Sequence, residues 1–127
     1  VAQDVTGALK LYRVAAEAGH AKSMNLVGRY LEEGVYCPMD KAAACEWYKR
    51  SANGGDFRGQ FSYASVLLEN GQLQSALVWY RQALDNGNLN FLRVAYPALR
   101  ASRSVAIQAV CVDYKKRLDE LELLANN

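Results

Sequence analysis

The sequence has few of the residues that catalytic and metal sites usually need. Its 127 residues include one histidine and three cysteines, so neither a multi-histidine metal site nor a disulfide framework is expected. Fifteen basic against 13 acidic residues leave a net charge of +2, which is too small to indicate nucleic-acid binding. An apolar content of 51% with only two prolines excludes a disordered or collagen-like chain. No apolar run approaches the roughly 20 residues of a membrane-spanning helix, so we expect no membrane span.

What the sequence does contain is an internal repeat. Three segments each carry an alanine four residues before a tyrosine and a glycine seven residues after it: Ala8, Tyr12 and Gly19; Ala44, Tyr48 and Gly55; Ala76, Tyr80 and Gly87. Apolar residues in each segment recur at helical spacing, which predicts one amphipathic helix per copy. Each glycine is expected to end its helix in the left-handed conformation. Asp40, just before Lys41, is expected to be the N-cap of the second copy.

A second type of helix is predicted between these copies. It carries Val27-Gly28 with Leu31 in one segment, Tyr63-Ala64 with Leu67 in the next, and more weakly Ala95-Tyr96 with Leu99. A small residue such as Gly28 or Ala64 allows a neighbouring helix to approach closely. The alternation of two helix types predicts an all-α fold, in which about seven helices form antiparallel pairs stacked as a superhelix, or α-solenoid.

At these residues the chain resembles the Sel-1-like repeat, a relative of the tetratricopeptide repeat. The resemblance rests on Lys41-Ala42, Trp47-Tyr48 and Gly55, on the run from Ala15 to Ala21, and on Gly34-Val35 with Pro38 and Asp40. It covers about residues 4–101 and is specific over 8–87. It implies a non-catalytic scaffold or adaptor for protein–protein interaction, in which the Leu-Gly-type helices line the concave side. Departures include Leu31 and Leu67 where the family has Tyr, and Tyr96-Pro97 where it has a small residue.

The domain organisation follows from these boundaries. Residues 1–103 are expected to form the repeat solenoid, and it should continue upstream because the first helix is the second member of a pair. Residues 104–127 lack Gly and Pro and predict one long helix with Ser104 as its N-cap. This helix is either a divergent last repeat or cap, or a docking and dimerisation helix.

The sequence contains no group of residues suited to act together as nucleophile, acid, base or metal ligands. No enzyme activity, cofactor or metal is therefore expected. His20 is interpreted as a turn residue, and Gly54-Gly55 ends a helix rather than forming a phosphate loop. The spacing leaves open a disulfide between Cys37 and Cys45. The unpaired third cysteine favours a reducing compartment such as the cytoplasm, although the family also occurs in the periplasm and secretory compartments.

A partner-binding surface is predicted on the concave groove, from side chains opposite the packed face of the second helix type. These residues are Lys22, Asn25, Arg29 and Glu32; Arg58, Phe61, Ser65 and Leu68; and Asn90, Arg93 and Arg100.

The set holds five basic residues and one acid, which favours a protein partner with an acidic segment or a free C-terminal carboxylate. Phe61 and Leu68 offer an apolar anchor. Two alternatives stay open. One is that these charges only solvate a helix face. The other is that the chain is a structural or oligomerisation segment of a larger protein that uses the C-terminal helix, for example in a homodimer.

Overall fold

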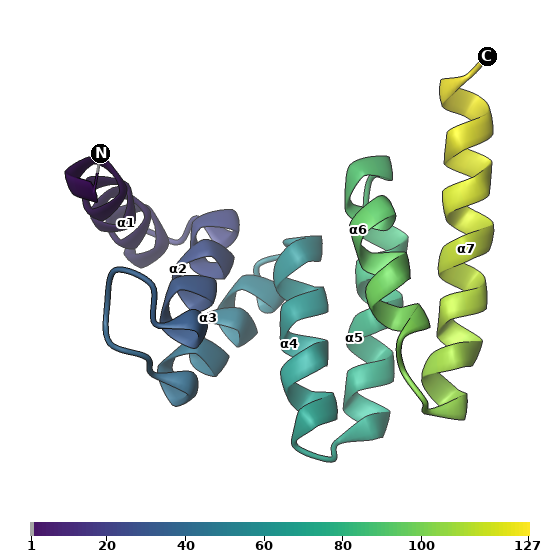
Figure 1. The fold of residues 1–127 in the computed structure, drawn as a ribbon, viewed down its shortest axis with the longest axis horizontal. Helices are drawn as coiled ribbons and strands as arrows, with labels where there is room; N and C mark the ends of the chain where they lie inside the picture. Colours follow the sequence, from purple (N-terminus) through teal and green to yellow (C-terminus); the bar gives the residue numbers. More distant parts are fainter. Residues whose placement is uncertain (1) are drawn as a thin grey trace.

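The computed structural model describes the backbone of residues 2–127 and the side chains of residues 7–127. Over this range it confirms the all-α solenoid. Residues 2–127 form seven helices and no strand: α1 (Ala2–Glu17), α2 (Ala21–Glu33), α3 (Lys41–Asn53), α4 (Phe57–Glu69), α5 (Leu73–Asn86), α6 (Leu89–Arg100) and α7 (Val105–Ala125). The helices follow one another along one direction, with α1 and α7 at opposite ends of the stack (Figure 1).

Side-chain caps begin four of the helices. Asp40 accepts a hydrogen bond from the Ala43 amide at 3.0 Å, and Asp56 accepts one from the Gly59 amide at 2.8 Å. Asn88 and Ser104 do the same at the start of α6 and α7. Each cap satisfies a backbone donor that has no partner within the helix. The predicted caps Asp40 and Ser104 are therefore confirmed.

The repeated glycines do not all end their helices in the same way. Gly19 and Gly55 have φ values of +99° and +91°, in the left-handed region as predicted. The prediction is wrong for Gly87, whose φ of −74° and ψ of 152° are extended. A Cβ on Gly87 would lie 2.4 Å from Cδ2 of Phe91. The glycine is thus needed there for space beside the Phe91 ring.

Three tyrosines, one on each of α3, α5 and α7, lie at the centre of the core. Tyr48, Tyr80 and Tyr114 are at most 2% exposed, and each hydroxyl has a hydrogen-bond partner. Tyr48 donates to the Glu32 carboxylate at 2.9 Å, and the Tyr80 hydroxyl lies 2.9 Å from that of Ser65. Tyr114 donates to the backbone carbonyl of Tyr80. Burial is the main cause that raises the pKa of all three phenols.

The apolar side chains form two adjoining clusters. One joins α1, α2 and α3, and the other joins α4 through α7. Tyr63 of α4 packs against both clusters. In the second cluster the Phe61 ring lies 5.0 Å from that of Tyr80 and 5.5 Å from that of Phe91, in edge-to-face geometry. The core is thus continuous along the stack.

The last helix belongs to the stack over most of its length. Ile107, Val110, Tyr114 and Leu118 are buried, and α7 contacts both α5 and α6. Its final turns extend past the first turn of α6 (Figure 1), and Leu123 and Leu124 in the last turns of α7 are 65% and 68% exposed. We therefore propose that α7 is the second helix of a divergent last repeat that extends beyond its partner.

The contact between α3 and α4 depends on a glycine. A Cβ on Gly59 would lie 2.6 Å from the Cβ of Ser51 and 3.1 Å from its carbonyl carbon. Ser51 is fully buried, and its hydroxyl donates to the Ala21 carbonyl at 2.6 Å, so it cannot easily move.

We predict that Gly59→Ala lowers the free energy of unfolding by about 1–3 kcal/mol, because the added methyl group forces α3 and α4 apart. The matched control is Gly7→Ala in α1, where a Cβ meets no atom within 4 Å. This change should raise the free energy of unfolding by about 0.5–1 kcal/mol through helix propensity. Urea denaturation measures both, and equal effects at the two positions would contradict the close approach.

Candidate functional site

A groove of about 320 Å³ lies across α2, α4 and α6, the three helices of the second type. It is lined by Asn25, Arg29, Arg58, Phe61, Ser62, Asn90, Phe91 and Val94. Five of these residues belong to the predicted binding set: Asn25, Arg29, Arg58, Phe61 and Asn90. The structure thus brings together predicted residues from three helices that are not consecutive in the chain.

Asn25 forms a buried polar floor in this groove. Its side chain is only 4% exposed, and its carboxamide oxygen accepts a hydrogen bond from the Ser62 hydroxyl at 2.8 Å. This bond links α2 to α4 and orients the amide group. The hydrogen bonds of residues 7–127 include none donated by the Asn25 amide nitrogen, although the residue lines the groove. An amide donor that lines a groove is suited to a carbonyl or carboxylate oxygen.

Two arginines supply the positive charge of the groove. The Arg29 side chain is 60% exposed, and its guanidinium lies 3.9 Å from the Glu33 carboxylate, at the limit of an ion pair. Arg58 is half-buried, and its guanidinium carbon lies 4.7 Å from the centre of the Phe57 ring. The ring face holds the Arg58 side chain in place and leaves N–H groups free for an anion.

The apolar wall differs from the predicted anchor. Phe61 lines the groove, but its ring also packs against Tyr80, Phe91 and Tyr114 in the core. Val94 on α6 is 75% exposed and lines the same groove. Val94 is therefore the apolar side chain available to a partner, whereas Phe61 mainly supports the groove from beneath.

Three other predicted residues, from α2 and α4, lie outside this groove. Lys22 is exposed on α2 and does not line it. Glu32 accepts the hydrogen bond from Tyr48 and borders a separate space between α2, α3 and α4. Ser65 bonds to the Tyr80 hydroxyl. Glu32 thus links α2 to α3, and Ser65 links α4 to α5.

The remaining three predicted residues are also engaged elsewhere. Leu68 packs against the apolar core. Arg93 forms a two-pronged ion pair with Glu122 of α7, at 2.7 and 2.9 Å. Arg100 lines a different cavity, between α6 and α7. None of them borders the groove across α2, α4 and α6.

Sequence reasoning missed three lining residues: Ser62, Phe91 and Val94. Leu31 of α2, Leu67 of α4 and Leu99 of α6 occupy the same position in their repeats. Counted from these leucines, the residues that line the groove lie nearer the start of the helix in α6 than in α2. The groove therefore runs obliquely across the helices. Ser62 and Val94 occupy equivalent positions, each five residues before the leucine of its helix. The repeat spacing would therefore have indicated either residue from the other.

The described residues offer little for other chemistry. Cys37, Cys45 and Cys111 are free thiols in the structure, so the bridge between Cys37 and Cys45 is not formed. Within residues 7–127 no group of three His, Cys, Asp or Glu side chains could hold a metal ion. Nor is any helix of residues 2–127 long and apolar enough to cross a membrane.

The order of the helices corresponds to a known repeat family. The Sel1 repeat model matches residues 1–20, 21–56 and 58–88, so that one match spans α2 and α3 and another spans α4 and α5. The chain belongs to the Sel1 repeat family. Sel1 repeats are in general protein–protein interaction modules, and the family is a non-catalytic repeat scaffold.

A solved Sel1 repeat protein from Oxalobacter formigenes has a similar fold, with a TM-score of 0.62 and 24% sequence identity. The match covers 94% of this chain and 49% of that protein, so the chain spans about half the length of the solved structure. At this identity the likeness shows the shared fold.

The ion pair between Arg93 and Glu122 predicts a pH-dependent contribution to stability. The hydrogen bonds from Arg93 hold the pKa of the Glu122 carboxyl below its ordinary value. The stabilisation should therefore be complete above the unfolded pKa of the carboxyl and be lost as the pH falls through the lower, folded pKa.

We predict that Glu122→Gln lowers the urea midpoint at pH 7 and that the difference from the unmodified chain disappears as the pH falls through the lowered, folded pKa of the Glu122 carboxyl. The matched control is Glu120→Gln, which removes an i,i+3 pair with Arg117 within the same helix. The control should have a smaller effect because its pair does not join two helices. A Glu122→Gln effect that is constant with pH would contradict the assignment.

Proposed function

We propose that this chain is a protein-interaction module that binds an acidic segment, or a free C-terminal carboxylate, of another protein in the groove across α2, α4 and α6. The observation that carries the proposal is the convergence of Arg29, Arg58 and the buried Asn25 on one groove. The family's general role in protein–protein interaction supports a protein as the ligand.

Each group in the groove has a distinct part in the proposed binding. The guanidinium of Arg29 or Arg58 would hold a carboxylate through two parallel hydrogen bonds. The Asn25 amide would donate to a backbone carbonyl or a carboxylate oxygen, and Ser62 fixes its orientation. Val94 would contact an apolar side chain of the partner. This combination favours a segment that alternates acidic and apolar residues.

We predict that peptides selected from a random library on the full chain are enriched in Asp, Glu or a free C-terminal carboxylate next to an apolar residue. The double change Arg29→Glu and Arg58→Glu should weaken such a peptide by at least about tenfold, because each charge-assisted hydrogen bond is replaced by repulsion. Fluorescence anisotropy at two salt concentrations measures the affinity.

The matched control is Lys49→Glu with Lys116→Glu, which gives the same change in net charge on exposed positions of α3 and α7. This control should keep the affinity, and circular dichroism should show unchanged helicity for both variants. Equal weakening by both pairs, or selection of peptides without acidic groups, would reject the groove as the binding site.

A second candidate function is self-association through the end of α7. The observation that favours it is the pair of exposed leucines, Leu123 and Leu124, on the turns that extend past α6. Removal of the whole helix cannot test this idea, because Ile107 and Tyr114 are fully buried in the core. Substitutions confined to the exposed end can test it.

We predict that, if α7 forms a dimer, Leu123→Glu with Leu124→Glu converts the particle measured by light scattering from a dimer to a monomer. Burial of leucines at such a contact drives association, and two carboxylates would oppose it. The control is Val78→Glu on α5, an equally apolar position that is 59% exposed. A chain that is monomeric before any change excludes this second function.

A further inference from the structure

Three tyrosines form a row on the first two helices and on the loop 34–40 that follows them. The Tyr12 ring of α1 lies 6.4 Å from the Tyr30 ring of α2, and the Tyr30 ring lies 6.3 Å from the ring of Tyr36 in the loop. Tyr12 and Tyr30 are half-buried, and Tyr36 is 51% exposed. These three residues, here called the tyrosine row, therefore present ring surface to the solvent.

Tyr36 has a backbone conformation that is unfavourable for its residue type. Its φ is +60°, and among residues 2–127 it is the only residue other than glycine with a positive φ. The Cβ atom makes the left-handed region unfavourable for tyrosine, whereas glycine occupies it freely. Because half of the Tyr36 side chain stays exposed, its burial offsets little of this strain. Strained residues of this kind cluster at binding and active sites.

The hydroxyl groups of the row also differ from those of the core tyrosines. The hydroxyls of Tyr48, Tyr80 and Tyr114 each bond within the protein. The hydrogen bonds of residues 7–127 include none made by the hydroxyls of Tyr30 and Tyr36, although both rings pack together. These two tyrosines can therefore donate to a ligand carbonyl while their rings contact an apolar group.

The tyrosine row is continuous with the groove across α2, α4 and α6. Arg29 lines that groove and also lines a smaller hollow of about 220 Å³, which it shares with Tyr30 and Glu33. A further cavity of about 450 Å³ lies between α1 and the loop 34–40, where Tyr36 lines it. A segment that leaves the groove past Arg29 thus reaches Tyr30 first and then Tyr36.

We propose that the partner segment bound in the groove continues past Arg29 onto the tyrosine row in the polyproline II conformation, with prolines against the rings. This inference rests on the function proposed for the groove and specifies its ligand further, as an acidic part followed or preceded by a proline-rich part. The occupant of the row is therefore the same segment of the same partner protein.

The spacing of the row fits this conformation. A polyproline II segment rises about 3.1 Å per residue, so two residues advance about 6.2 Å, close to the ring spacings of 6.4 and 6.3 Å. Its backbone forms no internal hydrogen bonds, so its carbonyls can accept protons from the tyrosine hydroxyls. The segment is already ordered before binding, and grooves lined by aromatic rings bind such segments at a low entropic cost.

Other regular conformations fit the row less well. An α-helix advances only about 3 Å in two residues and uses its carbonyls in internal hydrogen bonds. A β-strand advances by nearly the same distance as polyproline II, but strand binding needs the open edge of a sheet, and residues 2–127 contain no strand. The rings and hydroxyls of the row are the groups left for recognition, and they suit a proline-rich segment.

The test uses the full chain and the acidic peptide selected on the groove, called the core peptide. Two longer peptides carry Pro-Pro-Ala-Pro-Pro-Ala at one end or at the other, and matched peptides carry six Gly and Ser residues instead. Six residues of polyproline II span about 19 Å, of which the two ring spacings take about four residues. In fluorescence anisotropy, we expect one of the proline extensions to bind about tenfold tighter than the core peptide, and the Gly and Ser extensions to bind like it.

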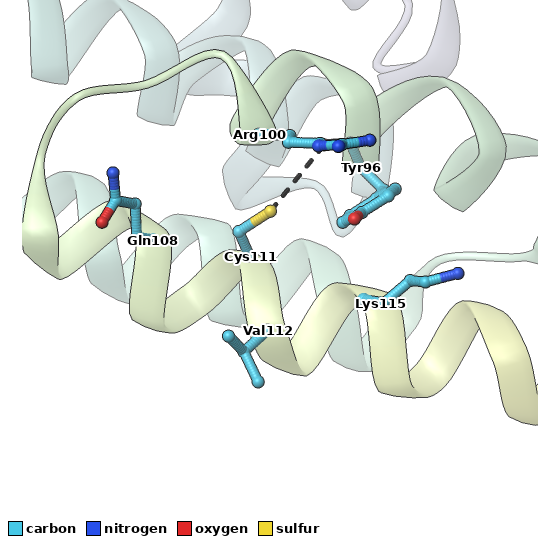
Figure 2. A pocket seen from close by; sticks show the side chains of 6 residues that line it. All are labelled: Tyr96, Arg100, Gln108, Cys111, Val112 and Lys115. Carbon is cyan, nitrogen blue, oxygen red and sulfur yellow. Dashed lines mark hydrogen bonds between the residues drawn. The ribbon is translucent and has the colours of Figure 1, made fainter.

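Tyr36→Gly makes the test specific. Glycine adopts the left-handed conformation freely, so the variant should keep its thermal midpoint and yet lose the tenfold gain. The core peptide should bind it unchanged, because Tyr36 does not line the groove. The matched control is Tyr96→Ala, which removes another half-buried tyrosine ring, beside the cavity between α6 and α7 (Figure 2). This control should keep the gain.

The outcomes separate this inference from the function on which it rests. Weakening of the core peptide by Arg29→Glu with Arg58→Glu, but no gain from either proline extension, overturns the inference alone. A gain that persists in Tyr36→Gly does the same. Self-association that Tyr36→Gly abolishes also overturns it, because the occupant is then a second copy of the chain. A core peptide that the double arginine change does not weaken rejects the proposed function, and the inference with it.

Discussion

The packing of a buried tyrosine on each of α3, α5 and α7 against the preceding helices is the interaction on which the rest of the structure depends. Tyr48, Tyr80 and Tyr114 are all but inaccessible to water, and each hydroxyl is bonded to a different kind of group. A Cβ on Gly28 would lie 2.6 Å from the Tyr48 ring. The absence of that side chain lets α2 and α3 pack closely, and similar pairs then stack into the solenoid.

This packing also decides which surfaces are left for binding. Because the tyrosine-bearing helices cover one side of α2, α4 and α6, the other side of these three helices forms an uninterrupted groove. The groove joins the Asn25 amide, the two arginines and Val94 on a rigid helical surface. A site held by helices needs little reordering when a ligand binds, which favours affinity. The family's general role as an interaction scaffold agrees with such a surface.

The last helix pair shows how a repeat can acquire a different surface while its core is retained. The buried tyrosine stays at position 114, but its hydroxyl bonds to a backbone carbonyl rather than to a carboxylate. Arg100 of α6 lines the cavity beside α7, and the Arg93–Glu122 pair joins α6 to the final turns of α7. Arg100 at this cavity thus lies apart from the groove that holds Arg29 and Arg58.

The sequence by itself determined the all-α solenoid, the seven helices, and the caps at Asp40 and Ser104, because periodicity and capping are local properties that repeat. It placed five of the eleven candidate residues on the observed groove. Only the tertiary structure decided the others. Arg93 pairs with a residue 29 positions away, and Gly87 is required by the Phe91 ring rather than by its own φ. The groove crosses the helices obliquely because each repeat is displaced from the one before it, and no single helix encodes that displacement.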